Sequence, residues 1–133
     1  MTNYIFILGG VLSGLGKGVT SASICCILKE LGFRVTIKKL DPYLNIDPGT
    51  MNPKEHGEVY VTQCGAEVDL DIGHYERLGG IECNKHNSTS SGQLFAQLLN
   101  NEREGHYLGK TVQLVPHLTD IIQKFIEFDS AKY

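Results

Sequence analysis

The order of apolar and polar residues predicts a strand, a helix and a second strand at the start of the chain. Residues 4–8 form a continuous apolar run, which is typical of a parallel strand buried on both faces. Apolar residues then recur at helical spacing, and Gly32 predicts the end of that helix. Residues 34–41 (RVTIKKLD) are rich in β-branched residues and predict the second strand. Such a unit requires a right-handed crossover and a parallel pair. The helical positions are Ile24, Ile27, Leu28 and Leu31.

The remaining chain predicts further short elements that follow an irregular segment. Residues 42–57 contain three prolines, and the apolar side chains among them favour an ordered loop. We expect strands over 58–62 and 111–115, and an amphipathic helix over 88–104 with a serine-rich start. Thr119 is expected to cap a final helix whose apolar stripe belongs to a core or an interface. The stripe consists of Ile121, Ile122, Phe125 and Ile126.

Length and composition indicate one domain over residues 1–133. Hydrophobic residues make up 41% of the chain and charged residues 20%, so the chain can bury a core. The net charge of −3 gives no global basic field, and we expect no nucleic-acid partner. The chain has no charged-then-apolar leader and no apolar run near about 18 residues. We therefore expect a cytoplasmic protein without a membrane segment.

The cysteines indicate free thiols. None of the pairs formed by Cys25, Cys26, Cys64 and Cys83 has C-x-x-C spacing. The spacing therefore does not favour a metal cluster or a disulfide framework. Free thiols in a reducing compartment fit the pattern better.

The glycine-rich stretch 9–20 (GGVLSGLGKGVT) lies between the first strand and the first helix, where such a loop can bind phosphate. Its backbone N–H groups can approach one anion, and Lys17 can reach the outer phosphates. The pattern departs from a standard phosphate loop, because five residues separate Gly10 from Gly16 and Gly18 follows the lysine where Ser or Thr is usual. Magnesium ligands would then come mainly from elsewhere. The alternative is a strand-to-helix turn that happens to be glycine-rich.

Two lysines end the second predicted strand. Lys38 and Lys39 should point in opposite directions, so at most one faces the phosphate site. Lys39 shares the side of Val35 and Ile37, and there it could be a second cationic group on a transferring phosphoryl. The alternative is two solvated lysines at a sheet edge.

The stretch 65–77 (GAEVDLDIGHYER) supplies candidate metal ligands. If it is extended, Glu67, Asp69 and Asp71 share one face. Magnesium usually takes one or two carboxylates together with substrate phosphates, so this face could complete the site. The alternatives are that the acids solvate an edge strand or cap the following helix. We interpret His74 as a structural or surface histidine, because nothing pairs with it at metal spacing.

Several long runs resemble one family, the CTP synthases, in their N-terminal synthetase (amidoligase) domain. The runs are GGVLSGLGKG, KKLDPYLNIDPGTMNPKEHGEVYV, GAEVDLDIGHYERL and NEREGHYLGKTVQLVPHLTD, and the resemblance extends from about residue 4 to about residue 126. It implies an α/β fold of the P-loop NTPase type (Rossmann-type), with a mainly parallel sheet flanked by helices, incomplete in this chain. It also implies that residues 1–133 are the first portion of that domain, with the rest of it and the glutaminase domain absent.

The resemblance implies a reaction and its partners. CTP synthases make CTP from UTP by ATP-dependent phosphorylation of the uracil 4-oxygen, followed by displacement of the phosphate by ammonia. The ammonia comes from glutamine, hydrolysed in a C-terminal glutaminase domain that is normally in the same chain. The implied cofactor is Mg²⁺, with ATP as co-substrate, and family members assemble as homotetramers with sites between subunits.

Residue roles carried over from the family fall on the matching positions. Lys17 and Lys39 are the implied catalytic residues, and Ser13 is the implied UTP contact. Asp71 is the implied ligand of Mg²⁺ and ATP. His56 lies in the family loop where ammonia enters, which implies a gate, with a buried structural histidine as the alternative. The implied ATP-binding positions are Gly14, Leu15, Gly16, Lys17, Gly18, Val19 and Asp71.

The chain also departs from the family pattern. His106 stands where aspartate is usual, and residues 78–84 fit poorly. The family domain continues beyond residue 133 with a second acidic magnesium ligand and the UTP specificity segments. No cysteine lies in a glutaminase nucleophile motif, so we expect no glutamine hydrolysis, and without the rest of the domain we expect the isolated chain to form no CTP. The alternatives are a truncated, non-catalytic remnant that binds nucleotide or pairs with a subunit, and another P-loop amidoligase.

Overall fold

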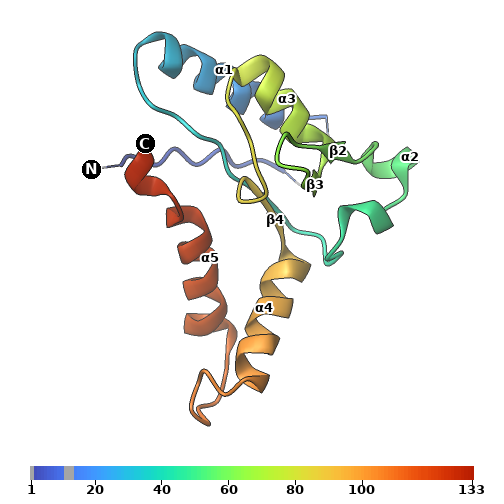
Figure 1. Ribbon diagram of the computed structural model, residues 1–133, viewed down its shortest axis with the longest axis vertical. Coiled ribbons are helices and arrows are strands. Elements are labelled where there is room, and N and C mark those ends of the chain that lie inside the picture. The colour runs from blue at the N-terminus through green and yellow to red at the C-terminus, as the bar shows by residue number, and fades with distance from the viewer. Residues whose placement is uncertain (1, 11–13) are drawn as a thin grey trace.

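The computed structural model describes residues 2–10 and 14–133, which form a body of helices and short strands with a two-helix arm (Figure 1). The arm, made of α4 and α5, extends away from the body, which contains α1, α3 and all the strands. The two ends of the chain lie close together, and the Thr2 hydroxyl donates to the Ser130 carbonyl at 2.7 Å. The helices are α1 (Lys17–Glu30), α2 (Pro53–His56), α3 (Leu70–Gly79), α4 (Ser91–Arg103) and α5 (Thr119–Glu127). The strands are β1 (Lys39–Asp41), β2 (Tyr60–Val61), β3 (Glu67–Val68) and β4 (Ser88–Ser90).

A small parallel sheet flanked by helices confirms the predicted α/β class. Strands β1 and β4 pair in parallel with Lys39 opposite Ser88 and Asp41 opposite Ser90. Strands β2 and β3 form a separate antiparallel pair. Strand β1 carries Lys39 and Asp41, two of the polar groups described below, and its pairing with β4 fixes the backbone of both.

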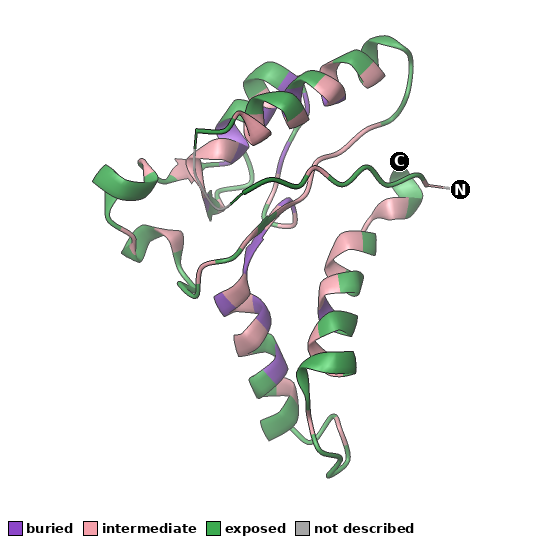
Figure 2. Ribbon diagram, turned by 180° about the vertical axis from the view of Figure 1, so that it is seen from behind, coloured by how far each residue is buried: buried purple, intermediate pink, exposed green. Residues whose placement is uncertain are grey.

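The main core lies between α1 and α3, which pack side by side (Figures 1 and 2). The two helices are in contact at Gly79, where a Cβ atom would lie 3.6 Å from Cys25 and from the Ala22 carbonyl, an ordinary van der Waals distance. Ala22 and Ile72 are fully buried. Burying a side chain such as Ile72 contributes about 1.5–3 kcal/mol to folding. The start of α1 is thereby held against the first turns of α3.

A second, smaller core joins α4 to α5 through Leu94, Leu98 and Ile121. A capping box starts α4, in which the Ser90 side chain accepts the Gln93 N–H and the Gln93 side chain accepts the Ser90 N–H. These reciprocal hydrogen bonds satisfy two backbone donors at the helix start. Among the residues that the structure describes, no helix combines the length and the apolar content needed to cross a membrane.

Several predicted strands are wrong or shorter than expected. Residues 4–8 are extended but pair with no described strand, and of residues 34–41 only the last three form β1. Apolar and β-branched composition favours an extended backbone, but a strand also needs a neighbouring strand to bond. Residues 58–62 shorten to the two residues of β2 for the same reason.

The predicted elements near the C-terminus also differ. No strand forms over residues 111–115, where the chain turns through Val115 and a cis peptide bond to Pro116. The final helix is present, but Thr119 is its first residue rather than its cap. The Thr119 hydroxyl donates to the Pro116 carbonyl at 2.8 Å, so it bonds the preceding turn.

Candidate functional site

The glycine-rich loop leads into α1 as the sequence predicts. Gly14 and Gly16 have φ angles of 81° and 83°, a conformation that side chains disfavour. Gly16 is the N-cap residue of α1 and contributes no side-chain cap. The helix start therefore presents backbone N–H groups and the positive end of its dipole, which favour an anion. Leu15 and Val19 are exposed beside it.

Lys17 folds back over this loop. A Cβ atom on Gly9 would lie 2.7 Å from Cδ of Lys17, so the lysine stem passes directly over that glycine. The Lys17 ammonium donates to the Gly10 carbonyl at 2.9 Å. Lys17 thus lies along the same loop whose amides would hold a phosphate. The implied UTP contact, Ser13, lies outside the described residues.

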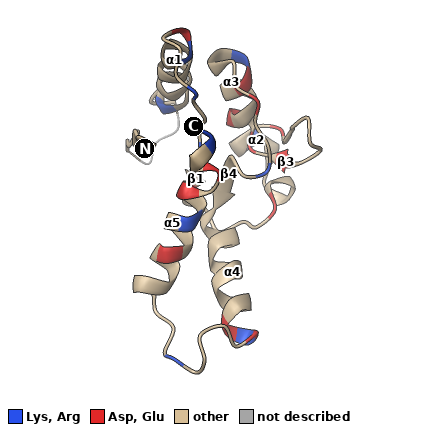
Figure 3. Cartoon of the chain, turned by 60° about the vertical axis from the view of Figure 1, so that its left-hand side comes forward, with Lys and Arg blue, Asp and Glu red and all other residues tan. Residues whose placement is uncertain are grey.

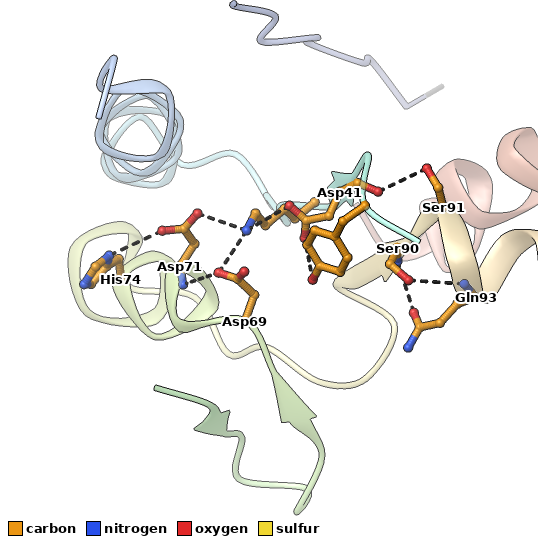
Figure 4. A network of polar contacts seen from close by, with 9 residues as sticks. Asp41, Asp69, Asp71, His74, Ser90, Ser91 and Gln93 are labelled. Carbon is orange, nitrogen blue, oxygen red and sulfur yellow. Dashed lines mark hydrogen bonds and ion pairs between the residues drawn. The ribbon is translucent and has the colours of Figure 1, made fainter. Parts of the chain in front are cut away.

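Lys39 is the centre of an acidic cluster, which we define as Asp41, Asp69 and Asp71 (Figure 4). Its Nζ atom lies 3.0 Å from Asp41 Oδ1, 2.9 Å from Asp69 Oδ1 and 3.0 Å from Asp71 Oδ2. The side chains of Lys39, Asp41 and Asp69 are only 15%, 11% and 11% exposed, whereas that of Asp71 is 45% exposed. The cluster therefore opens to solvent through Asp71.

The local fold explains this geometry and corrects one expectation. Asp69 and Asp71 do not share the face of an extended segment, because α3 begins at Leu70. Asp69 is the N-cap, and its Oδ1 accepts the Asp71 N–H at 2.9 Å. The alternative that an acid caps the following helix is thus correct for Asp69. Glu67 lies in β3, exposed and outside the acidic cluster.

The two lysines of residues 38–39 point in opposite directions, as the strand alternation predicts. Lys38 lies over the rings of Phe125 and Phe128, at 4.8 and 5.2 Å from their centroids. It also donates to the His86 carbonyl at 3.0 Å. Lys38 therefore links the C-terminal end of α5 to the body. The alternative of two solvated lysines is wrong.

Lys39 and the carboxylates of the acidic cluster shift one another's pKa values. Burial alone would lower the pKa of Lys39, but Asp41, Asp69 and Asp71 outweigh it and raise that pKa above 10.5. Burial raises the pKa of Asp41, and Lys39 partly opposes this. Burial, together with the charge of Asp71, raises the pKa of Tyr75 to about 12. Lys39 is therefore a permanently charged ammonium at neutral pH.

One large cleft, of about 1580 Å³, connects the loop and the acidic cluster. Lys17, Lys39 and Asp71 all line it. A Cβ atom on Gly18 would lie 3.7 Å from the Tyr75 ring, so the start of α1 is close to Tyr75. Tyr75 lies one helical turn after Asp71 in α3, so the start of α1 is also near Asp71. The volume exceeds that of a typical small-molecule pocket, so a nucleotide has room. The charged residues of β1 and α3 belong to the body and lie away from the tip of the arm (Figure 3).

The donor set fits magnesium held mainly by its substrate. Within the described residues no group of three or more His, Cys, Asp and Glu side chains could hold a metal by itself. Magnesium typically uses one or two carboxylates plus phosphate oxygens. Asp71, half-exposed and facing the same cleft as the loop, meets that requirement.

Two histidines also line the cleft. His56 ends α2, is exposed, and contacts the Tyr43 ring edge-on with the centroids 6.1 Å apart. The alternative of a buried structural histidine is therefore wrong. His74 is exposed, as expected of a surface histidine, and its Nδ1 lies 3.8 Å from Asp71 Oδ1.

Sequence reasoning missed Asp41 and Tyr75 as neighbours of the site. Asp41 follows Lys39 by two residues on a predicted strand, so strand alternation could have placed both on one side. Tyr75 follows Asp71 by four residues, which is the helical spacing that brings side chains together. The Tyr75 signal depends on where α3 begins, whereas the Asp41 signal needs only the predicted strand.

Comparisons with known proteins identify the family of the chain. A family profile described as CTP synthase N-terminus matches residues 3–132. The chain is 55% identical over 132 residues to a CTP synthase of Pelagibacter ubique, which covers 99% of this chain and 24% of the relative. It is 59% identical to one of Rickettsia rickettsii over 126 residues, 95% of this chain and 24% of the relative. A CTP synthase of Aquifex aeolicus is 57% identical over 127 residues, 96% of this chain and 24% of the relative. The chain thus spans about a quarter of the length of these relatives. By its match along nearly the whole of its length, the chain belongs to the family of CTP synthase N-terminal regions.

Proposed function

We propose that this chain supplies the phosphate-binding and magnesium-binding part of a CTP synthase, a ligase of pyrimidine biosynthesis that aminates UTP to CTP with ATP. Family membership supports the proposal. The single observation that carries it is the common cleft, which Lys17, Lys39 and Asp71 all line. In that cleft a loop of backbone amides, two ammonium groups and a carboxylate surround a space large enough for a nucleotide.

The proposed chemistry has two steps. The uracil 4-oxygen attacks the γ-phosphorus of ATP, and ADP leaves. Ammonia then attacks C4 of the ring, and inorganic phosphate leaves with the former 4-oxygen, giving CTP. The first step is needed because a carbonyl oxygen is a poor leaving group and its phosphate ester a good one. Positioning and charge stabilisation are the main contributions of a protein to such a transfer.

Each group of the cleft has a proposed role. The amides from Gly14 to Val19, together with Lys17, hold the ATP phosphates. Lys39 stabilises the charge on the phosphoryl group in transfer. Asp71 would hold Mg²⁺, which neutralises charge on the phosphates when bound. Ser13 contacts UTP in this proposal.

The proposal also includes partners. Ammonia comes from glutamine in a glutaminase domain, normally of the same chain, and the complete protein is a homotetramer. His56 gates the ammonia, which is supported by its exposure at the cleft beside Tyr43. Because the chain spans about a quarter of its relatives, we propose that the complete reaction requires the remainder of such a protein.

Nucleotide binding by the chain itself tests the proposal. Calorimetry with ATP and Mg²⁺ should give binding that Lys17→Ala weakens by about tenfold or more, as expected for loss of a charged phosphate contact. Lys110→Ala is the matched control, because Lys110 is an exposed lysine in the loop at the tip of the arm. Equal affinities of the two variants would show that the loop does not bind the nucleotide phosphates.

A second candidate is a remnant that pairs with a subunit and does not catalyse. It is favoured by the unpaired apolar run of residues 4–8, in which Phe6 is 65% and Leu8 88% exposed. An exposed apolar segment that pairs with no strand among the described residues invites association. We expect self-association in light scattering and no CTP from UTP, ATP and ammonia with the isolated chain. CTP formation that is abolished by Lys17→Ala would exclude the remnant.

A further inference from the structure

The ammonium of Lys39 has no donor left for a phosphate. An ammonium carries three N–H donors, and Lys39 faces three carboxylate oxygens at 2.9–3.0 Å. Contact with a transferring phosphoryl group therefore requires that Lys39 give up one of these partners. The proposed role of Lys39 thus depends on which of the three carboxylates can release its contact with the ammonium.

Asp69 and Asp41 are the fixed partners. Asp69 Oδ1 also accepts the Asp71 N–H at 2.9 Å, so this carboxylate is tied to the start of α3. Asp41 lies in β1, whose backbone pairs with β4, and its side chain is 11% exposed. Movement of either carboxylate would disturb a helix cap or bury a charge without its partner, and both changes are costly.

Asp71 is the exchangeable partner. Its side chain is 45% exposed and lines the cleft, and its other described partner is His74 at 3.8 Å. The cluster formally has two more negative charges than the single ammonium balances, so a divalent cation is attracted to its open side. A cation on Asp71 would also repel the Lys39 ammonium.

We propose that Lys39 and Mg²⁺ compete for Asp71, and that Asp41 and Asp69 hold Lys39 in place while the exchange frees one of its N–H donors. Lys39 can therefore donate to the phosphoryl group only when Mg²⁺ is bound to Asp71. Asp41 and Asp69 are positioning residues, because they act through Lys39. The inference rests on the proposed function, in which Asp71 holds Mg²⁺.

Chemical labelling of lysines tests the exchange in the unmodified protein. Acetylation requires an accessible amine, whereas three carboxylate oxygens lie 2.9–3.0 Å from the Lys39 ammonium and the side chain is only 15% exposed, so Lys39 should react slowly without metal. Titration with Mg²⁺ alone, at constant ionic strength, should raise the acetylation rate of Lys39 by at least about threefold, the effect of losing a modest ion pair. Lys110 in the same sample is the internal control, and its rate should not change.

Calorimetry with Mg²⁺ alone gives an independent measurement. Lys39→Met should bind Mg²⁺ about threefold to tenfold more tightly than the wild type, because the competing ammonium is gone. Lys110→Met removes the same charge at the tip of the arm and should leave the affinity unchanged. Asp71→Asn should abolish the binding and should make Lys39 react faster without metal. If Lys39→Met fails to fold, the labelling of the wild type still decides.

The outcomes separate the two proposals. Faster labelling of Lys39 with Mg²⁺, together with tighter binding by Lys39→Met, supports the exchange. Equal Mg²⁺ affinities of wild type and Lys39→Met, with unchanged labelling of Lys39, overturn the exchange but leave the magnesium role of Asp71 standing. Mg²⁺ affinity that Asp71→Asn does not alter overturns both.

Discussion

Oδ1 of Asp69 accepts the backbone N–H of Asp71 at 2.9 Å, so one carboxylate of the acidic cluster caps the helix that carries another. The two residues therefore have different structural roles, although both contact Lys39. Asp69 fixes the start of α3, and Asp71, more exposed, faces the cleft.

This difference predicts the effect of neutralising each residue. Asp71→Asn should weaken magnesium-dependent ATP binding by about tenfold, because it removes the carboxylate most open to the metal. Asp69→Asn should weaken that binding less, since Asn remains a good N-cap and the carboxylate of Asp71 is intact. Calorimetry with ATP, with and without Mg²⁺, measures both. Equal losses in the two variants would count against Asp71 as the metal ligand.

Stability tests the capping role of Asp69 separately. Asp69→Ala removes the cap and should lower the free energy of unfolding by about 1 kcal/mol relative to Asp69→Asn. Urea unfolding of the two variants measures this difference directly. A stability of Asp69→Ala equal to that of Asp69→Asn would show that the cap contributes nothing.

The sequence predicted the loop and the lysines better than it predicted the acidic cluster. The glycine-rich stretch, the first helix and the opposite directions of Lys38 and Lys39 depend on local chemistry, which a linear pattern contains. The alternation of Glu67, Asp69 and Asp71 suggested an extended face, yet Asp69 is also a good N-cap, and the cap prevailed. Two local preferences competed, and in the structure the capped helix forms and packs on α1.

Strand pairing is the second feature that the sequence pattern could not predict. Residues 34–41 and 4–8 have strand composition, but pairing depends on partners far along the chain, such as β4 for β1. Periodicity does not specify such partners, so strand lengths were overestimated. The meeting of Lys39 with Asp69 and Asp71 likewise joins segments 30 or more residues apart and became visible only in the fold.

Gly73 should be intolerant of a side chain. A Cβ atom there would lie 2.8 and 2.9 Å from Cδ2 and Cε2 of Tyr60, closer than carbon atoms pack. Tyr60 is held in place, because its hydroxyl donates to Glu76. We therefore expect Gly73→Ala to lower the free energy of unfolding by about 1–3 kcal/mol through overpacking.

A double-mutant cycle checks this cause. Tyr60→Ala removes the ring, so adding Gly73→Ala to it should cost clearly less than in the wild type. Urea unfolding of the four proteins gives the coupling. Additive costs would mean that another contact, rather than the Tyr60 ring, limits residue 73.

The four cysteines should differ in reactivity towards a thiol reagent. Cys64 is exposed, and hydrogen bonding, chiefly with the Thr62 hydroxyl at 3.2 Å, lowers the pKa of its thiol. Burial raises the pKa of Cys83 to about 12 and also raises that of Cys25. Since the thiolate is the reactive form, Cys64 should be modified first at pH 8, and Cys25 and Cys83 last. Mass spectrometry after brief alkylation identifies the site, and Cys64→Ser should remove the fast phase. Early modification of Cys83 would contradict the packing of α1 on α3.

Alkaline pH should remove the stabilisation that Lys39 provides. The acidic cluster raises the folded-state pKa of Lys39 above 10.5, so the folded protein binds this proton more tightly than the unfolded chain does. The stabilisation is therefore fully present below pH 10.5 and declines as the pH rises through the folded-state pKa. The difference in unfolding free energy between wild type and Lys39→Met should accordingly be constant near neutral pH and should shrink above about pH 10.5. Urea unfolding across this range measures it, with Lys110→Met as the control for loss of one lysine. A difference that stays constant into strong alkali would mean that the Lys39 stem, and not its charge, stabilises the fold.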